Sequence, residues 1–347
     1  MEAGQPTLAD WPAPSLRGTD DSASYSMTRV RTSGIEEQAA SLRKWDQVYE
    51  QMTPGRFNGS LFEVCFRGVQ IFRETTNQSV HETGAAGPGA RAIGVPLHVG
   101  GNALFGGEVV QTDALITLGS DDELDFYTPC SFDILGLTVD ERSLESYAAR
   151  IEHCDVSDLF RGKRVLTTNQ VQLDEFRRLL LSILHSVEAN PVALQFQQTQ
   201  RLLEQSLMTA IFNVLSDPCK ASAPEAVCPS RCQIVERAKR YMSSHIDQPI
   251  TVADLCVQLG VSRRTLQYSF QEVLGINALR LLRAMRLNGV RRDLKATKPD
   301  PRSVQDIAAR WGFWHLGHFV TDYKRMFGEL PSHTLRGDSR MAPAWPT

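Results

Sequence analysis

Four side chains able to bond the edges of DNA bases stand close together in the segment SRRTLQYSFQEVLG, residues 262–275. The spacing of Leu266, Phe270 and Leu274 predicts a helix that buries these three residues. The exposed positions in its first half are then Arg263, Arg264, Gln267 and Tyr268. Arg bonds guanine through two parallel hydrogen bonds, and Gln bonds adenine in the same way. We therefore expect this helix face to read base pairs in a major groove.

A second segment, HLGHFVTDYKRMFG at 315–328, has the same helical spacing but a different surface. Its apolar residues at helical spacing are Phe319, Tyr323, Met326 and Phe327. Its exposed early positions are Leu316, Gly317, His318, Val320 and Thr321. Because this face is nearly uncharged, we expect weaker readout, directed at thymine methyl groups. At the corner before it, Trp311 and Trp314 are predicted to pack against the helices.

Both segments form the second half of a helix-turn-helix pattern that occurs twice. Gly260 and Gly312 end the preceding helices, where a backbone with positive φ is needed. The predicted N-caps are Thr251, Ser262 and Ser303, with Asp254 and Asp306 three residues after the first and the last. Matched caps, stops and apolar positions about fifty residues apart indicate an internal repeat.

Between the two copies, the segment INALRLLRAMRLNGVRRDLK has apolar residues at helical spacing. About nineteen residues at 1.5 Å each make a helix of roughly 28 Å. Two recognition helices about 34 Å apart meet successive major grooves on one face of DNA. Basic residues on and around this helix are expected to contact phosphates: Arg283, Arg286, Arg291, Arg292, Lys324 and Arg325.

Over residues 231–336 the sequence resembles the AraC/XylS family of bacterial transcription regulators. The motifs that carry the resemblance are LCVQLGVSRRTLQYSF, the linking LLRAMRL and WGFWHLGHFVTDYKRMFGELPS. Cys256 and Ala278 stand where the family usually has Ala and Pro, and both are small apolar changes. The resemblance implies base contacts at Arg264, Gln267 and Tyr268. It further implies an N-terminal effector domain, activation through RNA polymerase, and pairing of two copies of the chain.

Within the family, the sequence looks most like the branch that contains the regulator of ethanolamine-utilisation operons. This finer resemblance implies an amine or amino-acid-derived effector, with cobalamin as a second candidate. Apart from that implication, no cofactor is expected.

The charge of the 347-residue chain is unevenly distributed along the sequence. Residues 231–340 hold nineteen Lys and Arg against ten Asp and Glu, a net charge of about +9. Because the whole chain carries only −3, the remainder carries about −12. A basic module joined to an acidic one favours DNA binding by the basic part.

The N-terminal part predicts a mixed region of short strands followed by helices. Residues 1–33 are rich in Pro, Gly, Ser and Asp and are interpreted as a mobile tail. Residues 35–50 are predicted to be helical. Strands are expected in LFEVCF, VQIFRET, AIGVPLHV, ALFGGEVV, ALITLG, LDFYTP and FDILGLTV. Helices are expected over 141–153, 171–189 and 192–215. The fold class is therefore α+β, a small cupin-like β-barrel or sandwich with helices before an all-α double helix-turn-helix domain.

The predicted domains are an effector-sensing and dimerisation domain over 34–216, a linker over 217–230, the DNA-binding domain over 231–336 and a tail over 337–347. Apolar stripes on the last two N-terminal helices are interpreted as core, with a dimer interface as the alternative. These stripes contain Leu179, Leu180, Ile183, Leu184, Val187, Leu203, Leu207, Ile211 and Val214.

Candidate effector contacts are Arg73, Glu74 and Asn77, near the end of a predicted strand. His81, His98 and His153 are too scattered for a cupin-type metal site, so no metal is expected. Seven scattered cysteines argue against a disulfide framework. Three of them, Cys219, Cys228 and Cys232, cluster in DPCKASAPEAVCPSRC, at the predicted linker and just after it, and lack a fourth ligand at zinc-finger spacing.

No G-x-S-x-G, P-loop, H-E-x-x-H or dinucleotide-binding fingerprint occurs, which argues against an enzyme. No segment has the roughly eighteen uninterrupted apolar residues of a membrane span. We expect a soluble cytoplasmic regulator that binds double-stranded DNA and a small-molecule effector. Two alternatives remain open: a DNA-binding protein indifferent to effectors, and an N-terminal domain with enzymatic activity.

Overall fold

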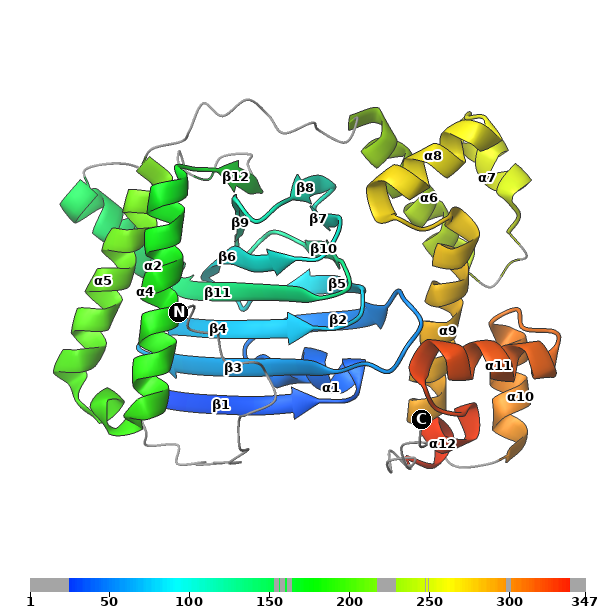
Figure 1. Ribbon diagram of the computed structural model, residues 1–347, viewed down its shortest axis with the longest axis horizontal. Helices are drawn as coiled ribbons and strands as arrows, with labels where there is room; N and C mark the ends of the chain where they lie inside the picture. Colours follow the sequence, from blue (N-terminus) through cyan, green and yellow to red (C-terminus); the bar gives the residue numbers. More distant parts are fainter. Residues whose placement is uncertain are drawn as a thin grey trace, which may run out of the picture.

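The computed structural model describes residues 25–152, 156, 160, 164–216, 229–246, 248, 250–297 and 301–337. A β-sandwich with helices forms the N-terminal half, and helices alone form the C-terminal half (Figure 1). The predicted fold class is confirmed.

The N-terminal half consists of two antiparallel sheets that face each other. The larger sheet has the order β1-β3-β4-β11-β6-β9-β12, and the smaller has the order β2-β5-β10-β7-β8. The strands are β1 (Tyr25–Thr32), β2 (Asp46–Gln51), β3 (Gly59–Phe66), β4 (Val69–Thr76), β5 (Val80–Ala85), β6 (Ala90–Val99), β7 (Ala103–Phe105), β8 (Glu108–Val110), β9 (Ala114–Leu118), β10 (Leu124–Thr128), β11 (Phe132–Asp140) and β12 (Val165–Thr167).

Tight turns connect the hairpins. Between β3 and β4, Arg67 and Gly68 both have positive φ, at 45° and 77°. Two such residues match the twist of antiparallel strands, and Gly adopts this conformation at low cost. The turn therefore sets the β3–β4 register, in which Phe66 pairs with Val69.

Helices cover the outer face of the larger sheet (Figure 1). They are α2 (Glu141–Tyr147), a π-helix (Ala148–Glu152), α4 (Gln170–Ala189), a 3-10 helix (Pro191–Gln195) and α5 (Gln197–Ser216). In the apolar stripes of α4 and α5, Leu179 and Leu203 are partly buried and the other seven residues are buried. All belong to the core of this half, which favours the first of the two interpretations of the stripes.

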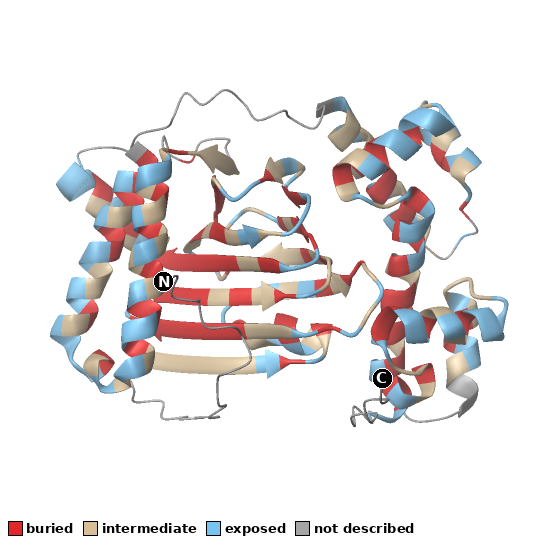
Figure 2. Ribbon diagram, in the orientation of Figure 1, coloured by how far each residue is buried: buried red, intermediate tan, exposed pale blue. Residues whose placement is uncertain are grey.

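The C-terminal half contains both helix-turn-helix units. Its helices are α6 (Pro229–Ser244), α7 (Val252–Leu259), α8 (Arg263–Leu274), α9 (Ala278–Ala296), α10 (Pro301–Arg310), α11 (Leu316–Phe327) and α12 (Pro331–Arg336). The buried residues form one cluster that runs along α9 and joins both units (Figure 2). None of the helices among the described residues is long and apolar enough to cross a membrane.

Three sequence predictions about the N-terminal half were wrong. Residues 25–32 belong to strand β1 and not to a tail, because they pair along their whole length with β3. The helix predicted over 35–50 ends early: α1 spans Ile35–Ser41, and Asp46–Gln51 is strand β2. In β2, Tyr49 is buried while Val48 is exposed, the alternation of a strand rather than the period of a helix. Strands β5 and β12 were not predicted.

Two boundaries near the linker and the second unit also differ. Helix α6 begins at Pro229, so the predicted linker is two residues too long, and 217–228 lie outside the described residues. Ser303 lies inside α10, which begins at Pro301, so it is not the N-cap. Proline is favoured in the first turn of a helix because it needs no N–H partner there.

Candidate nucleic-acid interface and internal cavity

The first unit presents a polar recognition helix. Thr251 and Asp254 form a reciprocal capping box at the start of α7, and Gly260 ends that helix with φ of 68°. The Ser262 hydroxyl accepts a hydrogen bond from the Thr265 N–H and so caps α8. As predicted, Arg263, Arg264, Gln267 and Tyr268 are exposed in the first half of α8, and Thr265 is exposed as well. The Arg264 guanidinium lies 5.3 Å from the centre of the Tyr268 ring, a cation–π contact.

The second unit presents an apolar recognition helix. Gly312 has φ of 79° at the turn, as predicted, and His315 at the start of α11 makes no side-chain cap. The residues predicted to be buried on α11 are buried. Leu316, Gly317, His318 and Thr321 are exposed, and Val320 is half-buried.

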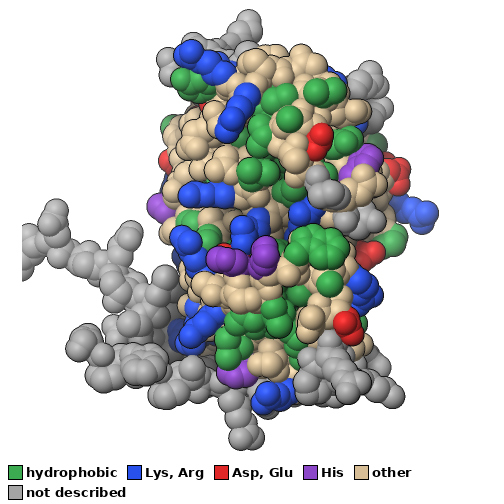
Figure 3. Space-filling model, turned by 90° about the vertical axis from the view of Figure 1, so that its right-hand side faces the viewer, with side chains coloured by type: hydrophobic (Ala, Val, Ile, Leu, Met, Phe, Trp, Pro, Cys, Tyr) green, Lys and Arg blue, Asp and Glu red, His purple; other side chains and the backbone are tan. Residues whose placement is uncertain are grey.

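The two tryptophans at the second corner differ. Trp311 packs against Gly289 of α9, where a Cβ would come within 2.2 Å of the indole, and its N–H donates to Asp293. Trp314 is 80% exposed, so the prediction that it packs was wrong. Figure 3 shows the face that the C-terminal half turns away from the β-sandwich. Lys, Arg, His and hydrophobic side chains are mixed on this face, and few carboxylates lie among them. The exposed indole adds to the apolar part of this face.

The basic residues predicted to contact phosphates fall into two groups. Lys324 and Arg325 are exposed on α11, and Arg283 is exposed but paired with Asp322. Arg286, by contrast, donates to the carbonyls of Ile246 and Gln248, bonds that tie α9 to the segment after α6. The predicted phosphate contact does not fit this role.

Arg291 and its neighbours on α9 hold the two halves of the molecule together. The Arg291 side chain is 8% exposed, with its guanidinium 2.8 Å from Glu36 and 2.5 Å from Glu329. Its burial between two carboxylates leaves it no access to a phosphate, which corrects the prediction. One turn along α9, Lys295 also pairs with Glu36, and Arg292 pairs with Glu50 of β2.

Arg291, Arg292 and Lys295 and their partners form part of the contact surface between the two halves, here called the seam. Direct hydrogen bonds also contribute to it. The Asn288 side chain accepts from the Gln51 N–H at 3.1 Å and donates to the Gln51 carbonyl at 2.8 Å. The Gln51 side chain and the Gly55 N–H both donate to the Met326 carbonyl of α11. The second unit is thus tied to the N-terminal half through its backbone.

The first unit meets the seam through α6. The buried Lys239 ammonium lies 3.3 Å from the Asp125 carboxylate of β10, 2.7 Å from Glu236, and 4.0 Å from the centre of the Tyr127 ring. Asn102 donates to the Glu272 carbonyl of α8. Both units therefore contact the N-terminal half.

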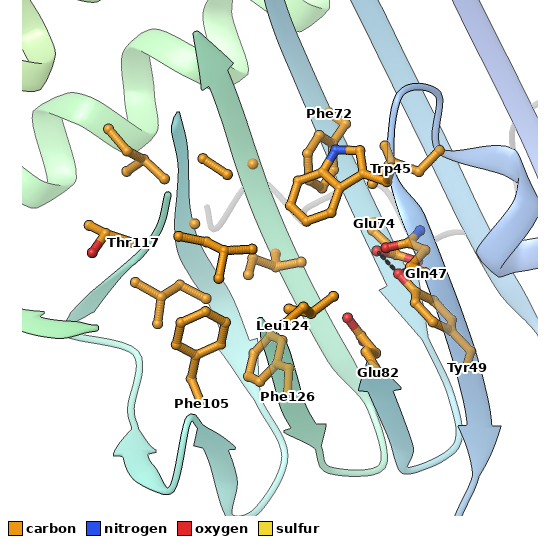
Figure 4. Close-up of a pocket in the computed structure, with 18 residues that line it drawn as sticks. Trp45, Gln47, Tyr49, Phe72, Glu74, Glu82, Phe105, Thr117, Leu124 and Phe126 are labelled. Atoms are coloured by element: carbon orange, nitrogen blue, oxygen red, sulfur yellow. Dashed lines mark hydrogen bonds between the residues drawn. The ribbon is translucent and has the colours of Figure 1, made fainter. Parts of the chain in front are cut away.

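A cavity of about 60 Å³ lies between the two sheets (Figure 4). Aromatic and aliphatic side chains form most of its wall. Gln47, Tyr49, Glu74 and Glu82 lie together on one side, and Thr117 lies across from them. The full lining is Leu42, Trp45, Gln47, Tyr49, Phe72, Glu74, Glu82, Ala92, Ile93, Gly94, Phe105, Ile116, Thr117, Leu118, Leu124, Phe126, Ile134 and Gly136.

Two buried carboxylates define the polar side of the cavity. The Tyr49 hydroxyl lies 3.2 and 3.1 Å from the two oxygens of Glu74, and the Gln38 amide donates to Glu74 at 2.8 Å. Burial raises the pKa of Glu74 to about 7. Burial, with repulsion by Glu74, raises the pKa of Glu82 well above its usual value.

The smaller sheet places the cavity and the seam on its opposite faces. Its register aligns one row of residues across the strands that lines the cavity: Tyr49, Glu82, Phe126 and Phe105. The adjacent row is Glu50, His81, Tyr127 and Leu104. From this second row, Glu50 pairs with Arg292, Tyr127 contacts Lys239, and Leu104 joins the core of the C-terminal half. Side chains alternate between faces along a strand, so the cavity and the seam lie one sheet apart.

Of the three predicted effector contacts, only Glu74 faces the cavity. Arg73 lies on the opposite face of the sheet and forms two hydrogen bonds with Asp133. Asn77 follows β4 and caps a turn, accepting from the Asn58 N–H and donating to the Arg56 carbonyl. Sequence reasoning missed Glu82 and Tyr49, because both lie in strands that it did not predict. A strand assignment for VHETGA would have placed Glu82 on the same face as Val80, which is buried.

No group of three or more potential metal ligands occurs among the described residues, where His81 instead stacks on Tyr127 and bonds Asp125. His98 is exposed in β6, and His153 lies outside the described residues, as do Cys219 and Cys228. Cys232 is half-buried in α6. The predicted linker cluster is therefore described only in part.

Comparison with known proteins finds a family model in the C-terminal half and relatives that match part of the chain. Residues 255–337 match the family model of a helix-turn-helix domain. A probable thc operon regulatory protein of Rhodococcus erythropolis is 30% identical over 209 residues, which cover 60% of this chain and 63% of that protein. The XylDLEGF operon transcriptional activator 3 of Pseudomonas putida is 29% identical over 168 residues, 48% of this chain and 49% of that protein. The chain thus spans less than two thirds of either relative.

Among solved structures, a probable AraC family transcriptional regulator from Rhodopseudomonas palustris is 32% identical. The match covers 30% of this chain and 96% of that one, with a TM-score of 0.29.

Proposed function

We propose that this chain, a helix-turn-helix transcriptional regulator of the AraC/XylS family, binds operator DNA with an affinity set by a small molecule in the cavity. The family is one of regulators and not of enzymes. In this proposal the cavity between the sheets is the effector site. Contacts at the seam transmit the effect of ligand binding to the helix-turn-helix units.

The observation that carries the proposal is the pair of adjacent rows across the smaller sheet. Tyr49 and Glu82 line the cavity, while their neighbours Glu50 and His81 face the seam, where Glu50 pairs with Arg292 of α9. Helix α1 repeats this arrangement: Gln38 bonds Glu74 in the cavity, and Glu36 bonds Arg291 and Lys295. A ligand that moves the cavity side chains by a fraction of an ångström shifts these strands and α1 against α9. Such a shift biases which relative placement of the two halves is stable.

The base contacts follow from the exposed faces. Arg264 and Gln267 of α8, with Arg263 and Tyr268 beside them, supply polar readout of one major groove. On α11, Leu316, His318, Val320 and Thr321 surround the exposed backbone of Gly317 and supply a largely apolar readout of the next groove. Lys324, Arg325 and Arg283 then contact phosphates. Because Asp322 already holds Arg283, its contribution requires exchange of that partner.

The partners follow from the same reading. A cytoplasmic activator of this kind contacts RNA polymerase, and a second copy of the chain would pair through the N-terminal half. The exposed side chains Leu202 and Phe196, on and just before α5, lie outside the core and are the surface that such pairing would cover. The relatives named above regulate thc and xyl operons, so an effector of the ethanolamine-regulator type has no support from them and rests on the cavity alone.

The test starts from selection of DNA fragments by the full-length protein, followed by titration of the selected fragment. We expect Arg264→Ala to weaken the selected fragment by about 1–3 kcal/mol more than random DNA. The matched control is Arg178→Ala on α4, which removes the same charge from an exposed position in the N-terminal half. A protein that binds all fragments equally, or whose Arg264→Ala variant behaves like the control, contradicts sequence-specific readout.

The effector part has its own readout. We expect operator affinity to change when a cavity ligand is added, and this change to disappear in Arg292→Ala, which breaks the Glu50 contact at the seam. Operator affinity indifferent to every ligand that binds the cavity would favour the alternative, a DNA-binding protein without an effector.

A further inference from the structure

We infer that the cavity takes a small organic cation, an alkylammonium group held between the carboxylates of Glu74 and Glu82 with its carbon chain against the aromatic wall. The inference rests on the proposed effector role of the cavity and adds the chemical class of the ligand.

The first support is the charge of the lining. Among the eighteen residues that line the cavity, two carry carboxylates, and none is Lys, Arg or His. Buried acids in proteins are ordinarily paired with a cation or a metal. Since the lining supplies no cation, the balancing charge has to come from a proton or from a ligand.

The second support is a count of hydrogen-bond donors. The Tyr49 hydroxyl contacts both oxygens of Glu74. Its hydrogen bond to Glu82 also offsets a small part of the rise in the pKa of that acid. Yet Tyr49 has a single proton to donate. Gln38 supplies one further bond, to Glu74. Glu82 is 8% exposed, and its carboxylate points into the cavity toward Glu74 and Tyr49 (Figure 4). An ammonium group brings up to three N–H donors and satisfies both acids at once.

The third support is the shape and character of the remaining wall. Leu124 and Phe126 lie next to Glu82 on the adjacent strand, and Phe105 lies one strand further on. Phe72 and Trp45 close another side (Figure 4). Aromatic faces attract cations through the ring quadrupole, and aliphatic walls take an alkyl chain. A volume of about 60 Å³ equals roughly four to six water positions, which limits the ligand to a few heavy atoms.

The same geometry disfavours other ligands of this size. A carboxylate ligand would face two acids across an apolar cavity without any basic partner. A neutral alcohol can bond to the acids but leaves their charges uncompensated whenever they ionise. A metal ion would need more ligands, and no cluster of three or more acid, His or Cys side chains occurs in the described part of the chain.

Cation binding is therefore linked to loss of protons. The pKa of Glu74 is raised to about 7 and that of Glu82 is raised as well, so below pH 7 the acids are largely protonated and attract a cation weakly. Above pH 7 Glu74 is ionised. We expect cation affinity to rise about tenfold between pH 6 and pH 8, because the ionised fraction of a group with pKa near 7 rises by that factor.

The pH dependence of stability without ligand has the opposite sense. Because the folded-state pKa of Glu74 lies above its ordinary value, the folded protein holds an extra proton between about pH 4.5 and 7. The free energy of unfolding should fall as pH rises through this window, and an added alkylammonium should restore it.

The experiment is calorimetric titration and thermal unfolding of the full-length protein with n-propylammonium chloride, and with tetramethylammonium chloride to test a methylated head. Sodium propionate and 1-propanol are the probes of matched length. We expect n-propylammonium to bind and to raise Tm more at pH 8 than at pH 6, with release of protons. Tetramethylammonium, which has no N–H donor, should bind more weakly. Equal or tighter binding of propionate or propanol, or no binding of either cation at any pH, overturns the inference.

Isosteric variants locate the site. Glu82→Gln should abolish the response to the cation, while Glu63→Gln, which alters a buried carboxylate outside the cavity, should keep it. If Glu82→Gln fails to fold, Glu74→Gln and the pH dependence of the unaltered protein decide the question. A cation that binds but leaves operator affinity unchanged refutes the effector role and supports the ligand class. If no cation binds but another molecule changes operator affinity, the ligand class is refuted and the effector role is supported.

Discussion

The two helix-turn-helix units share a backbone plan and differ in their surfaces. In the first, a capping box and a serine cap start the helices, and Arg264 and Gln267 stand exposed on the recognition helix. In the second, α11 begins without a side-chain cap and presents Leu316 beside the exposed Trp314. Charged and amide groups read bases through hydrogen bonds, whereas an apolar face is limited to methyl contacts and shape.

The units also differ in how the N-terminal half holds them. The second unit receives two bonds at the Met326 carbonyl, and α9 beside it carries Asn288 and Arg291 into the seam. The first is held by α6 through Lys239, and by one bond to a carbonyl of α8. In the proposed function, this difference divides the work of the repeat: the first copy reads sequence, and the second is the one most directly controlled by the N-terminal half.

The largest expected effect separates buried from exposed seam contacts. Arg291→Ala leaves Glu36 and Glu329 without their shared buried partner and should cost about 3–5 kcal/mol in the free energy of unfolding. Its neighbour Arg292→Ala removes a pair in which the arginine is 44% exposed and should cost less than about 1 kcal/mol. Chemical denaturation of both variants measures this. Equal costs would mean that the second unit is not anchored through Arg291.

A change at the turn glycines compares the units directly. Gly260 and Gly312 both have positive φ, so a valine at either should introduce about 1–3 kcal/mol of strain. At Gly312 the new Cβ would also lie 3.4 Å from the Arg286 guanidinium, whereas nothing lies within 4 Å at Gly260. We expect Gly312→Val to unfold the second unit locally and to be the more harmful of the two. Hydrogen exchange, resolved by peptide, distinguishes the units, and equal protection in both would contradict this.

The recognition helices should respond differently to truncation. Arg264→Ala should cost about 1–3 kcal/mol on the selected operator and relax preference at one base pair. Leu316→Ala loses at most apolar contact and should cost less. Binding titrations on operator and random DNA decide the matter. If Arg264→Ala weakens both DNAs equally, the residue contacts phosphate and the first unit does not read bases through it.

The smallest effect concerns phosphate contacts in the second unit. Lys324→Ala and Arg325→Ala should each reduce the dependence of log Kd on log salt by about one, without changing sequence preference.

The fragment 229–337, which has its own apolar core, should fold and retain a steep salt dependence. A flat response in that fragment would place the phosphate contacts outside the double unit.

The repeat was predictable from sequence because its determinants are local. Glycine at a positive-φ turn, a cap three residues before its partner, and apolar positions three and four apart all lie within short segments. The exposed faces of α8 and α11 followed directly from that spacing. Ser303 was misassigned because Pro301, two residues earlier, was the better start for a helix.

The seam and the cavity were not predictable because they depend on contacts far apart in the chain. Arg291 bonds Glu36 across 255 positions, and sequence reasoning read its charge as available to DNA. Part of the positive excess of the C-terminal half in fact neutralises acids of the other half. Strand β5 was not predicted because His81, Glu82 and Thr83 give it little apolar pattern. Glu82 is buried only because the two sheets close over it.

The alternation of cavity and seam residues along β2, β5 and β10 restricts how such regulators can be recombined. A chimera joined within residues 217–228 would keep the cavity and the two helix-turn-helix units intact, yet it would place foreign side chains opposite Glu50 and Tyr127. Exchange of ligand specificity is less demanding, because within the smaller sheet it requires changes only in the row that faces the cavity. In β2, β5 and β10, residues that line the cavity alternate with residues that contact the C-terminal half. The two sets can therefore be changed separately.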